Sequence, residues 1–434
     1  MKGKFDIGKI SLSKLSVIFY WLLIIALLGL FFTNDFGLVD IHKTAIITAI
    51  GVDSEEGEVI VTCELAVPQP SQSGDATKYT QIQGSGLTIA DALNEVNSKT
   101  GFYPQLQFCR LVLLGDSCKE EQLFRMLGCL YRKNYSELTA LVAMCSGKAS
   151  DMLSMTSPIS EMTSEAIRKA VAEEIEKSAN AATVNLKDIA MMQFSKSKAC
   201  YMPYVEANVP GTSQNGGNGD AVGGDETQGG SQGGQGSQGG QEGGSSGEEG
   251  GGQSGQSGGQ SSQGGAEAEF TARRTAIFSD GKFTAILDDR QSFALSIIKD
   301  DIRLATLPCD AEDIHYTLGL KNVNGGVNLK IEGDTPVLTV SFKANAQIQG
   351  ARIMVKPDET SHDDAVAAPV LQGAEEEMTA RFGGLLDVIR QTDCDVLGIK
   401  ELLYKYHTGR FEEFKDDVLS KMEIEYKVEI QSVN

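Results

Sequence analysis

The side chains best suited to chemistry are few and scattered along this chain. The four histidines are His42, His315, His362 and His407, and none belongs to an HExxH motif. None has a cysteine or carboxylate nearby at the spacing that is typical of metal ligands. No GxSxG motif marks a serine nucleophile. The sequence therefore predicts no metal-binding residues, and although a Cys–His pair is open to any of the cysteines, nothing singles one out.

Two glycine-containing segments come nearest to phosphate-binding loops. Gly147-Lys148-Ala149-Ser150 lacks the upstream glycine that would complete a Walker A cradle. Gly84-Ser85-Gly86 precedes an expected helix, but it has no third glycine and no βαβ context. A plain turn is the favoured interpretation of this second segment. We therefore expect no cofactor and no cofactor-binding residues.

Adjacent carboxylates occur at Asp288-Asp289, Asp363-Asp364 and Asp416-Asp417. A catalytic pair would need one acid that burial keeps protonated. All three pairs lie in polar stretches near expected turns or helix surfaces, so solvated faces are favoured. An enzyme is not expected, and no catalytic residues are predicted.

The cysteines allow two interpretations. They lie at positions 63, 109, 118, 129, 145, 200, 309 and 394. An even number outside the cell is compatible with disulfides. Their spacings are irregular, however, no CxxC occurs, and several lie in apolar contexts such as Phe108-Cys109-Arg110-Leu111. Mostly buried thiols are therefore favoured over disulfides.

An apolar run at residues 15–32 follows four lysines near the N-terminus, at positions 2, 4, 9 and 14. At ~1.5 Å rise per residue, a helix of this length is close to the minimum that spans a bilayer core. The lysines favour a cytoplasmic N-terminus over residues 1–14, with the rest of the chain outside. A cleaved signal peptide is the alternative, but phenylalanines crowd the place where a small-residue cleavage site would fall. An uncleaved single-pass anchor is favoured.

The charge and composition of the rest of the chain limit its partners and indicate its organisation. The net charge of −21 over 434 residues argues against nucleic acid as a partner and against broad electrostatic binding to anionic lipid. Residues 211–265 are almost wholly Gly, Gln and Ser with a few Glu, which is typical of a flexible coil. This segment is either a tether between domains or a surface loop of one assembly.

The expected fold class is α+β: a transmembrane helix followed by three mixed α+β domains, the last separated by a disordered linker. The predicted boundaries are an N-terminal α+β domain at 41–117, a second, helix-rich domain at 118–210, the linker at 211–267 and a C-terminal domain at 270–434.

Within these domains, alternation and turn signals predict the local elements. The main strands that the sequence predicts are residues 45–50, 59–65, 106–114 and 138–144. Thr88 and Ser160 are expected to cap helices. Ser279-Asp280-Gly281 predicts a hairpin turn, and residues 422–430 alternate between apolar and charged side chains as a half-buried strand does.

Several segments resemble, in order, those of one known family. They are His42 to Asp53 with the following GEVIVTCELAVPQP, Gly86 to Ala92, Phe108 to Gly115, Tyr201-Met-Pro-Tyr204, Thr275 to Phe278 with Gly281 to Asp288, Asp395-Val-Leu-Gly398 and the last strand. Their order and spacing are similar to the Ger(x)C spore germination proteins, which are the C subunits of germinant receptors. The match covers nearly all of the exterior except the linker.

The resemblance implies a non-enzymatic receptor component on the outer face of the spore's inner membrane. It implies two partners, a multipass A-type subunit and a transporter-like B-type subunit, and it supplies no catalytic residues. Typical members carry a lipobox cysteine and a diacylglycerol anchor, whereas this chain offers an apolar helix, and the Gly/Gln/Ser insertion is unusual. The alternative is a stand-alone envelope solute-binding or sensing module of a divergent, non-germination branch.

Overall fold

The computed structural model describes residues 12–33, 44–69, 76–101, 103–132, 136–174, 182–210, 266–299, 302–353 and 366–433. Several predictions fall outside these ranges. They are most of the basic N-terminus at 1–14, the disorder of the linker, and the positions of His42, His362 and Asp363-Asp364.

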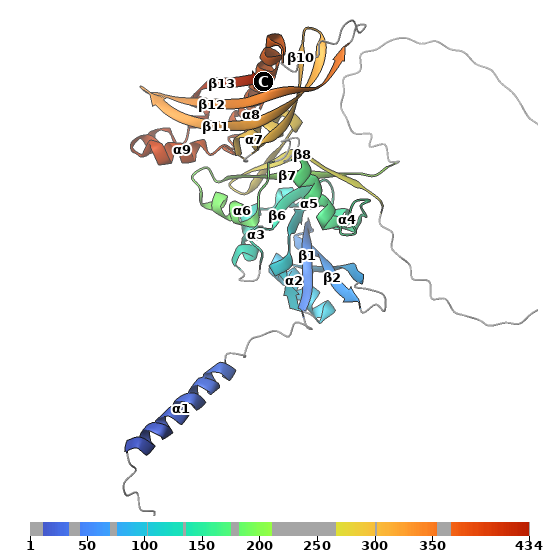
Figure 1. Cartoon of the computed structure of the whole chain (residues 1–434), viewed down its shortest axis with the longest axis vertical. Helices are drawn as coiled ribbons and strands as arrows, with labels where there is room; N and C mark the ends of the chain where they lie inside the picture. Colours follow the sequence, from blue (N-terminus) through green and yellow to red (C-terminus); the bar gives the residue numbers. More distant parts are fainter. Residues whose placement is uncertain are drawn as a thin grey trace, which may run out of the picture.

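The described chain contains two sheets (Figure 1). The strands of the first are β1 (Thr44–Glu55), β2 (Glu58–Gln69), β3 (Ala76–Gly86), β4 (Tyr103–Gln105), β5 (Leu111–Leu114), β6 (Leu141–Cys145), β7 (Ala199–Asn208), β8 (Glu269–Ser279) and β9 (Lys282–Leu287). The strands of the second are β10 (Leu304–Ala311), β11 (Ile314–Glu332), β12 (Thr335–Ile353) and β13 (Glu423–Ser432).

The helices fall into an N-terminal helix and two groups that pack on the sheets. They are α1 (Leu12–Thr33), α2 (Ile89–Thr100), α3 (Leu123–Arg132), α4 (Ala149–Ser154), α5 (Thr163–Glu173), α6 (Leu186–Phe194), α7 (Asp289–Lys299), α8 (Ala368–Thr392), α9 (Ile399–Tyr406), α10 (Phe411–Phe414) and α11 (Val418–Lys421). Short 3₁₀ turns are η2 (Leu106–Phe108), η3 (Asp116–Glu120) and η5 (Thr408–Arg410).

The first sheet has nine strands in the order β3-β2-β1-β5-β6-β7-β8-β9, with β4 paired to β1. Its centre is parallel, because β5 pairs with β1, β6 with β5 and β7 with β6 in the same direction. Its flanks are antiparallel hairpins, β2–β3 on one side and β8–β9 on the other. The strands expected from residues 45 to 65 are thus confirmed as β1 and β2.

Helices cover both faces of this sheet. Helices α2, α3 and α6 contribute buried leucines, isoleucines and alanines to a cluster on one face. Helices α4 and α5 contribute Ala149, Met152, Leu153, Ile167 and Val171 to a separate cluster on the other. Since both faces are covered, the central strands β5 and β6 consist of apolar residues, and all four residues of β5 are buried.

The second sheet has four strands in the order β10-β11-β12-β13, and it lies above the first sheet in Figure 1. Helices α7 and α8 pack against it, and Phe342 of β12 meets Phe382 of α8 edge to face, with ring centroids 6.0 Å apart. The same core also includes Tyr201 and Ile277 from the first sheet. One continuous apolar core therefore joins the two sheets.

The sheet also decides between the two alternatives for the Gly/Gln/Ser segment. Asn208 pairs with Glu269 at the open end of the antiparallel β7–β8 ladder, so the chain leaves and re-enters at neighbouring points of one sheet. The segment is an insertion between adjacent strands of one assembly. The strands that follow it continue the first sheet, where the sequence predicted the start of a separate domain.

Other predictions divide into confirmed and wrong. Thr88 caps α2, with its Oγ1 accepting from the Asp91 backbone N–H at 3.2 Å. The last strand alternates as expected. The strand expected at 106–114 is instead a 3₁₀ turn followed by β5. Ser160 does not cap α5, whose N-cap is Met162.

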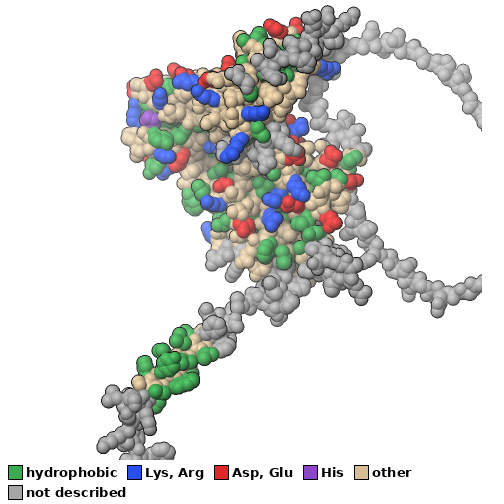
Figure 2. Space-filling view, viewed as in Figure 1, with side chains coloured by type: hydrophobic (Ala, Val, Ile, Leu, Met, Phe, Trp, Pro, Cys, Tyr) green, Lys and Arg blue, Asp and Glu red, His purple; other side chains and the backbone are tan. Residues whose placement is uncertain are grey.

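Helix α1 is apolar on all sides, and its described side chains, from Ser16 to Leu30, are mostly exposed (Figure 2). Within the described residues, no helix reaches the combination of length and hydropathy that a membrane span needs. The expected transmembrane span at residues 15–32 is therefore not supported by the structure.

The position of the insertion generates a prediction about stability. Replacing residues 211–265 with a four-residue Gly/Asn turn should preserve the fold, because the ladder already holds both ends together. The shorter closure should raise the free energy of unfolding by about 2 kcal/mol, the entropic difference between the two loop lengths. Urea unfolding of both proteins measures this. The same turn in place of residues 70–75, between β2 and β3, is the control. Loss of cooperative unfolding in the shortened protein would contradict the topology.

Candidate docking groove

An open groove of about 1050 Å³ lies on the face of the first sheet that α2, α3 and α6 cover. Its lining comes from the start of α2, the length of α3, the end of α6, and the two hairpin turns at Gly57 and Asp280. Segments as far apart in the sequence as Gly57 and Asp280 thus form one concave surface.

Helix α3 is held at its start by the β8–β9 hairpin. The Leu123 backbone N–H donates to the Gly281 carbonyl at 2.7 Å, and the Gln122 side-chain amide donates to the Asp280 carbonyl at 2.9 Å. Asp280 and Gly281 both have positive φ, as the predicted turn requires, and a Cβ on Gly281 would collide with the Gln122 amide. The turn foreseen from Ser279-Asp280-Gly281 therefore also positions α3.

Two apolar side chains of the groove are unusually exposed. Phe194, the last residue of α6, is 83% exposed, and Leu87, just before the Thr88 cap, is 78% exposed. Outside α1, these are the most exposed large apolar side chains in the described part of the chain. Single exposed apolar residues are ordinary, so it is the placement of both at one concave surface that makes this groove a candidate contact site.

The groove also carries basic side chains. Arg125 and Arg132 of α3 both line it and are exposed, and among the described residues neither guanidinium has an ion-pair partner. Lys198 is paired with Asp280 at 3.6 Å, and Glu121 accepts a hydrogen bond from the Ser54 hydroxyl at 2.8 Å. This surface is therefore locally basic on a chain whose net charge is −21.

Cys129 is the cysteine that lines the groove, and it is half-buried. The other seven are buried, and all eight, which lie in the described residues, are unlinked thiols. This confirms the burial predicted from sequence. Burial raises the pKa of Cys63 and Cys118 to about 12, so these thiols are protonated at neutral pH and are poor nucleophiles.

The segment that resembled the end of a Walker A loop has a structural role. The backbone N–H groups of Ala149 and Ser150 donate to the two carboxylate oxygens of Asp53 at 2.8 and 3.0 Å. Asp53 is buried, and a Cβ on Gly115 would collide with its carboxylate. The donors that would bind a phosphate are thus already occupied by a carboxylate from β1.

Gly84-Ser85-Gly86 is likewise structural, but it is strand rather than the expected turn. A Cβ on Gly84 would collide with the Ala92 carbonyl of α2, and a Cβ on Gly86 would lie 2.6 Å from the Asp91 Cβ. The Ser85 N–H donates to the Glu95 carboxylate. These glycines allow α2 to pack directly on β3.

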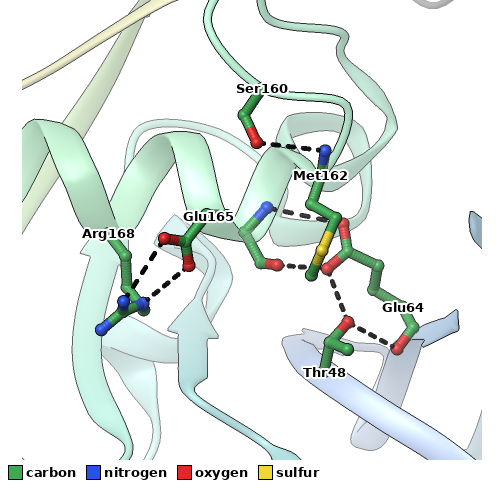
Figure 3. A network of polar contacts seen from close by, with 7 residues as sticks. Thr48, Glu64, Ser160, Met162, Glu165 and Arg168 are labelled. Carbon is green, nitrogen blue, oxygen red and sulfur yellow. Dashed lines mark hydrogen bonds and ion pairs between the residues drawn. The ribbon is translucent and has the colours of Figure 1, made fainter.

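A second buried carboxylate, Glu64 of β2, lies beneath α5 (Figure 3). Its Oε2 accepts from the Thr48 hydroxyl at 2.8 Å and from the Ser164 hydroxyl, and its Oε1 accepts from the Ser164 backbone N–H at 3.4 Å. Ser164 lies in the first turn of α5, where the helix dipole favours a negative charge. Glu64 thus accepts hydrogen bonds from the first turn of α5, the role that the sequence predicted for Ser160.

A third buried carboxylate, Asp395, connects the two halves of the molecule, which are the half that contains the first sheet and the half that contains the second. It accepts from the backbone N–H groups of Ile399 and Lys400 at the start of α9, both at 2.7 Å. It also accepts from the hydroxyl of Ser197, which lies just before β7, at 2.5 Å. Burial raises the pKa of Asp395, and these hydrogen bonds oppose that effect.

Of the remaining polar residues singled out in the sequence, Asp289, Cys309 and His315 line one cavity, and the others lie apart. Asp288 accepts from the Gln291 N–H at 2.8 Å near the start of α7, Asp417 pairs with Lys421, and His315 lies 2.6 Å from Asp310. His407 contacts the Leu329 carbonyl at 3.1 Å. These are local contacts on separate elements.

A second cavity, of about 590 Å³, lies between α7, α8 and β10. Glu377 accepts from Arg290 at 2.5 Å and from the buried Arg381 at 2.7 Å. The acidic and basic side chains that line it are equal in number if the one histidine is neutral. We interpret this cavity as an ion-pair network at the junction of the sheets.

Sequence reasoning did not identify the groove, although one signal was available. Helix α6 buries Leu186 and Ile189, which are three residues apart on one face. Phe194 is five residues beyond Ile189 and therefore out of phase with that face. A large aromatic residue at such a position indicates a contact other than the protein's own core.

The family model of the spore germination protein N-terminal domain matches residues 38–207. The family model described as spore germination B3/GerAC-like, C-terminal, matches residues 273–433. These two matches define a spore germination protein. The chain belongs to the Ger(x)C family.

The crystal structure of the GerBC protein aligns with 89% of this chain and 97% of its own, at 12% identity and a TM-score of 0.47. No curated protein matches the sequence.

The exposure of the cysteines predicts selective labelling. At neutral pH a maleimide reagent should modify Cys129 at least about tenfold faster than any other cysteine, since burial protects the rest. Mass spectrometry after timed quenching gives the sites. The Cys129→Ser variant should lose the fast phase, and a fast phase that persists in it would contradict the burial pattern.

The raised thiol pKa values predict a loss of stability at alkaline pH. Burial raises the pKa of Cys63, Cys109, Cys118 and Cys394 from 9.0 to about 12. The unfolded chain loses these protons at a lower pH than the folded chain does. The stabilisation is therefore complete below the thiol pKa of the unfolded chain, and it is lost as the pH rises through the thiol pKa of the folded chain. Near pH 10, each thiol should remove about 1 kcal/mol from the free energy of unfolding.

Urea unfolding at about pH 8 and about pH 10, under reducing conditions, measures this loss. The double variant Cys63→Ala/Cys118→Ala is the matched control, since it removes two of the titrating groups. It should lose less stability between the two pH values than the parent does. An equal loss in both proteins would show that other groups are responsible.

Proposed function

We propose that this chain is a non-enzymatic subunit of a spore germinant receptor, which takes part in nutrient-triggered germination through protein–protein contacts. The observation that carries the proposal is the match of both family domains, in order, over residues 38–207 and 273–433. We propose as its partners a multipass A-type subunit and a transporter-like B-type subunit. Its proposed location is the outer face of the spore's inner membrane.

We further propose that α1 provides a single-pass attachment to that membrane, with the N-terminus in the cytoplasm. The described side chains of α1 include Val17, Phe19, Trp21, Leu27 and Leu30, each more than half exposed. Large apolar side chains on all sides of one helix need an apolar environment, which lipid supplies. The lysines that precede the helix support the orientation.

A stand-alone solute-binding or sensing module is the alternative function. Such a module needs an enclosed pocket in which a few polar groups converge on the ligand. The groove instead presents Phe194 and Leu87 with most of their surface exposed. Exposed side chains of this kind favour a large partner over a small solute.

The membrane attachment is tested by placing charges in α1. The double variant Leu22→Lys/Ile25→Lys should move the protein from the membrane to the soluble fraction, because each lysine near the centre of a span costs about 2.5–3.5 kcal/mol. Deletion of residues 15–32 should do the same and should abolish co-purification with the A-type and B-type subunits. Fractionation of spore inner membranes and immunoblotting provide the measurement.

A matched control replaces residues 15–32 with an unrelated apolar segment of equal length, which should restore membrane fractionation. If the lysine variant still fractionates with membranes and partners, α1 is not what localises the protein. If the unmodified protein co-purifies with neither subunit, the receptor proposal itself is wrong.

A further inference from the structure

We infer that the groove binds an amphipathic helix of a partner receptor subunit, whose carboxylates face Arg125 and Arg132. The inference rests on the proposed function, because that function supplies the partner. It goes further in assigning the interface to one surface and in giving the chemistry of the segment that binds there.

The shape of the groove favours a helix. Its walls are α3 along its length, the start of α2 and the end of α6. A groove between helices accepts the apolar face of another helix, with anchors at helical spacing. Phe194 and Leu87 are placed at this surface to contact such anchors. A few well-packed anchors carry most of the binding energy of an interface.

The charge of the groove indicates which polar side chains the partner helix presents to it. Arg125 and Arg132 are seven residues apart on α3 and both line the groove. At ~1.5 Å per residue, they lie about 10 Å apart along the helix axis. A helix beside α3 matches them with two carboxylates that are also seven residues apart. Arginine forms bidentate pairs with carboxylates, which fix the register as well as the charge.

Two other occupants are less consistent with these features. A second copy of this chain would bring another net charge of −21 to the contact, and long-range repulsion would oppose it. A lipid surface contacts projecting side chains most easily, whereas this surface is concave. Both remain outcomes that the experiment distinguishes.

Cys129 provides a reporter inside the groove, since it lines the surface and is the one cysteine that is not fully buried. The full-length chain is prepared in vesicles of phosphatidylcholine and phosphatidylglycerol, with and without the A-type and B-type subunits. Labelling of Cys129 by a maleimide-polyethylene glycol reagent is then timed. We expect at least tenfold slower labelling when the subunits are present, and fast labelling in vesicles of this chain alone.

Substitutions then test the two parts of the interface. Phe194→Ser and Arg125→Glu should each weaken co-purification with the subunits at least tenfold and restore fast labelling of Cys129. The matched controls are Ile159→Ser, which changes an apolar residue that is 63% exposed outside the groove, and Arg352→Glu, on β12 of the second sheet. Both should bind as the parent does. Slow labelling of the seven buried cysteines confirms that each variant is folded.

The outcomes separate this inference from the function on which it rests. If the subunits co-purify but Phe194→Ser and Arg125→Glu bind normally, the receptor function stands and the groove is not the interface. Protection of Cys129 in vesicles without the subunits assigns the groove to lipid. Protection that depends on the concentration of this chain alone assigns it to a second copy. Either result overturns the inference.

Discussion

Buried carboxylates that bind the first turns of helices determine how this chain is assembled. Asp53 binds the start of α4, Glu64 the start of α5 and Asp395 the start of α9. A buried charge is costly unless several donors satisfy it. Here backbone N–H groups bind each one, hydroxyls also bind Glu64 and Asp395, and the positive end of the helix dipole adds to the effect. The arrangement tolerates little displacement, because a helix that moved would leave a buried charge without its donors.

These contacts connect parts of the chain that are far apart in sequence. Asp53 and Glu64 are on β1 and β2, whereas the helices they bind begin about 100 residues later. The two carboxylates therefore fix the layer of helices opposite the groove. Asp395 does the same between the sheets, because Ser197 comes from the loop before β7 and α9 packs on β11. The long insertion between β7 and β8 is compatible with this assembly, since the ladder that flanks it is continuous with the sheet.

Local patterns in the sequence predicted much of the fold. Alternation identified the last strand, and turn chemistry identified the hairpin at Asp280-Gly281, because both depend on a few adjacent residues. The sequence did not predict that β8 and β9 extend the first sheet, since strand pairing across a long insertion leaves no local signal. It misassigned residues 106–108 as strand, because an apolar run does not distinguish a strand from a 3₁₀ turn. The groove was missed for a related reason, since it forms only when three helices and two turns come together.

The groove and the joint between the sheets share one segment of the chain. Phe194 ends α6 at the rim of the groove, and the residues that follow contact the second half of the molecule. The Lys196 backbone N–H donates to Glu401 at 2.8 Å, and its ammonium lies 4.4 Å from the centre of the Tyr404 ring. Ser197 then binds Asp395, and Lys198 returns to the lining of the groove.

A molecule bound against Phe194 and Lys198 therefore rests on a segment that α9 holds in place. If the two halves of the molecule moved relative to each other, Phe194 and Lys198 would move with respect to Arg125 on α3. A partner that contacts both sides of the groove would then bind one arrangement more tightly than another, and binding would shift the population towards that arrangement. The free energy of such coupling is limited to the difference between the two affinities, so it depends on contacts to both α3 and the 194–198 segment. Contacts to either side alone would bind the protein without affecting the arrangement of its halves.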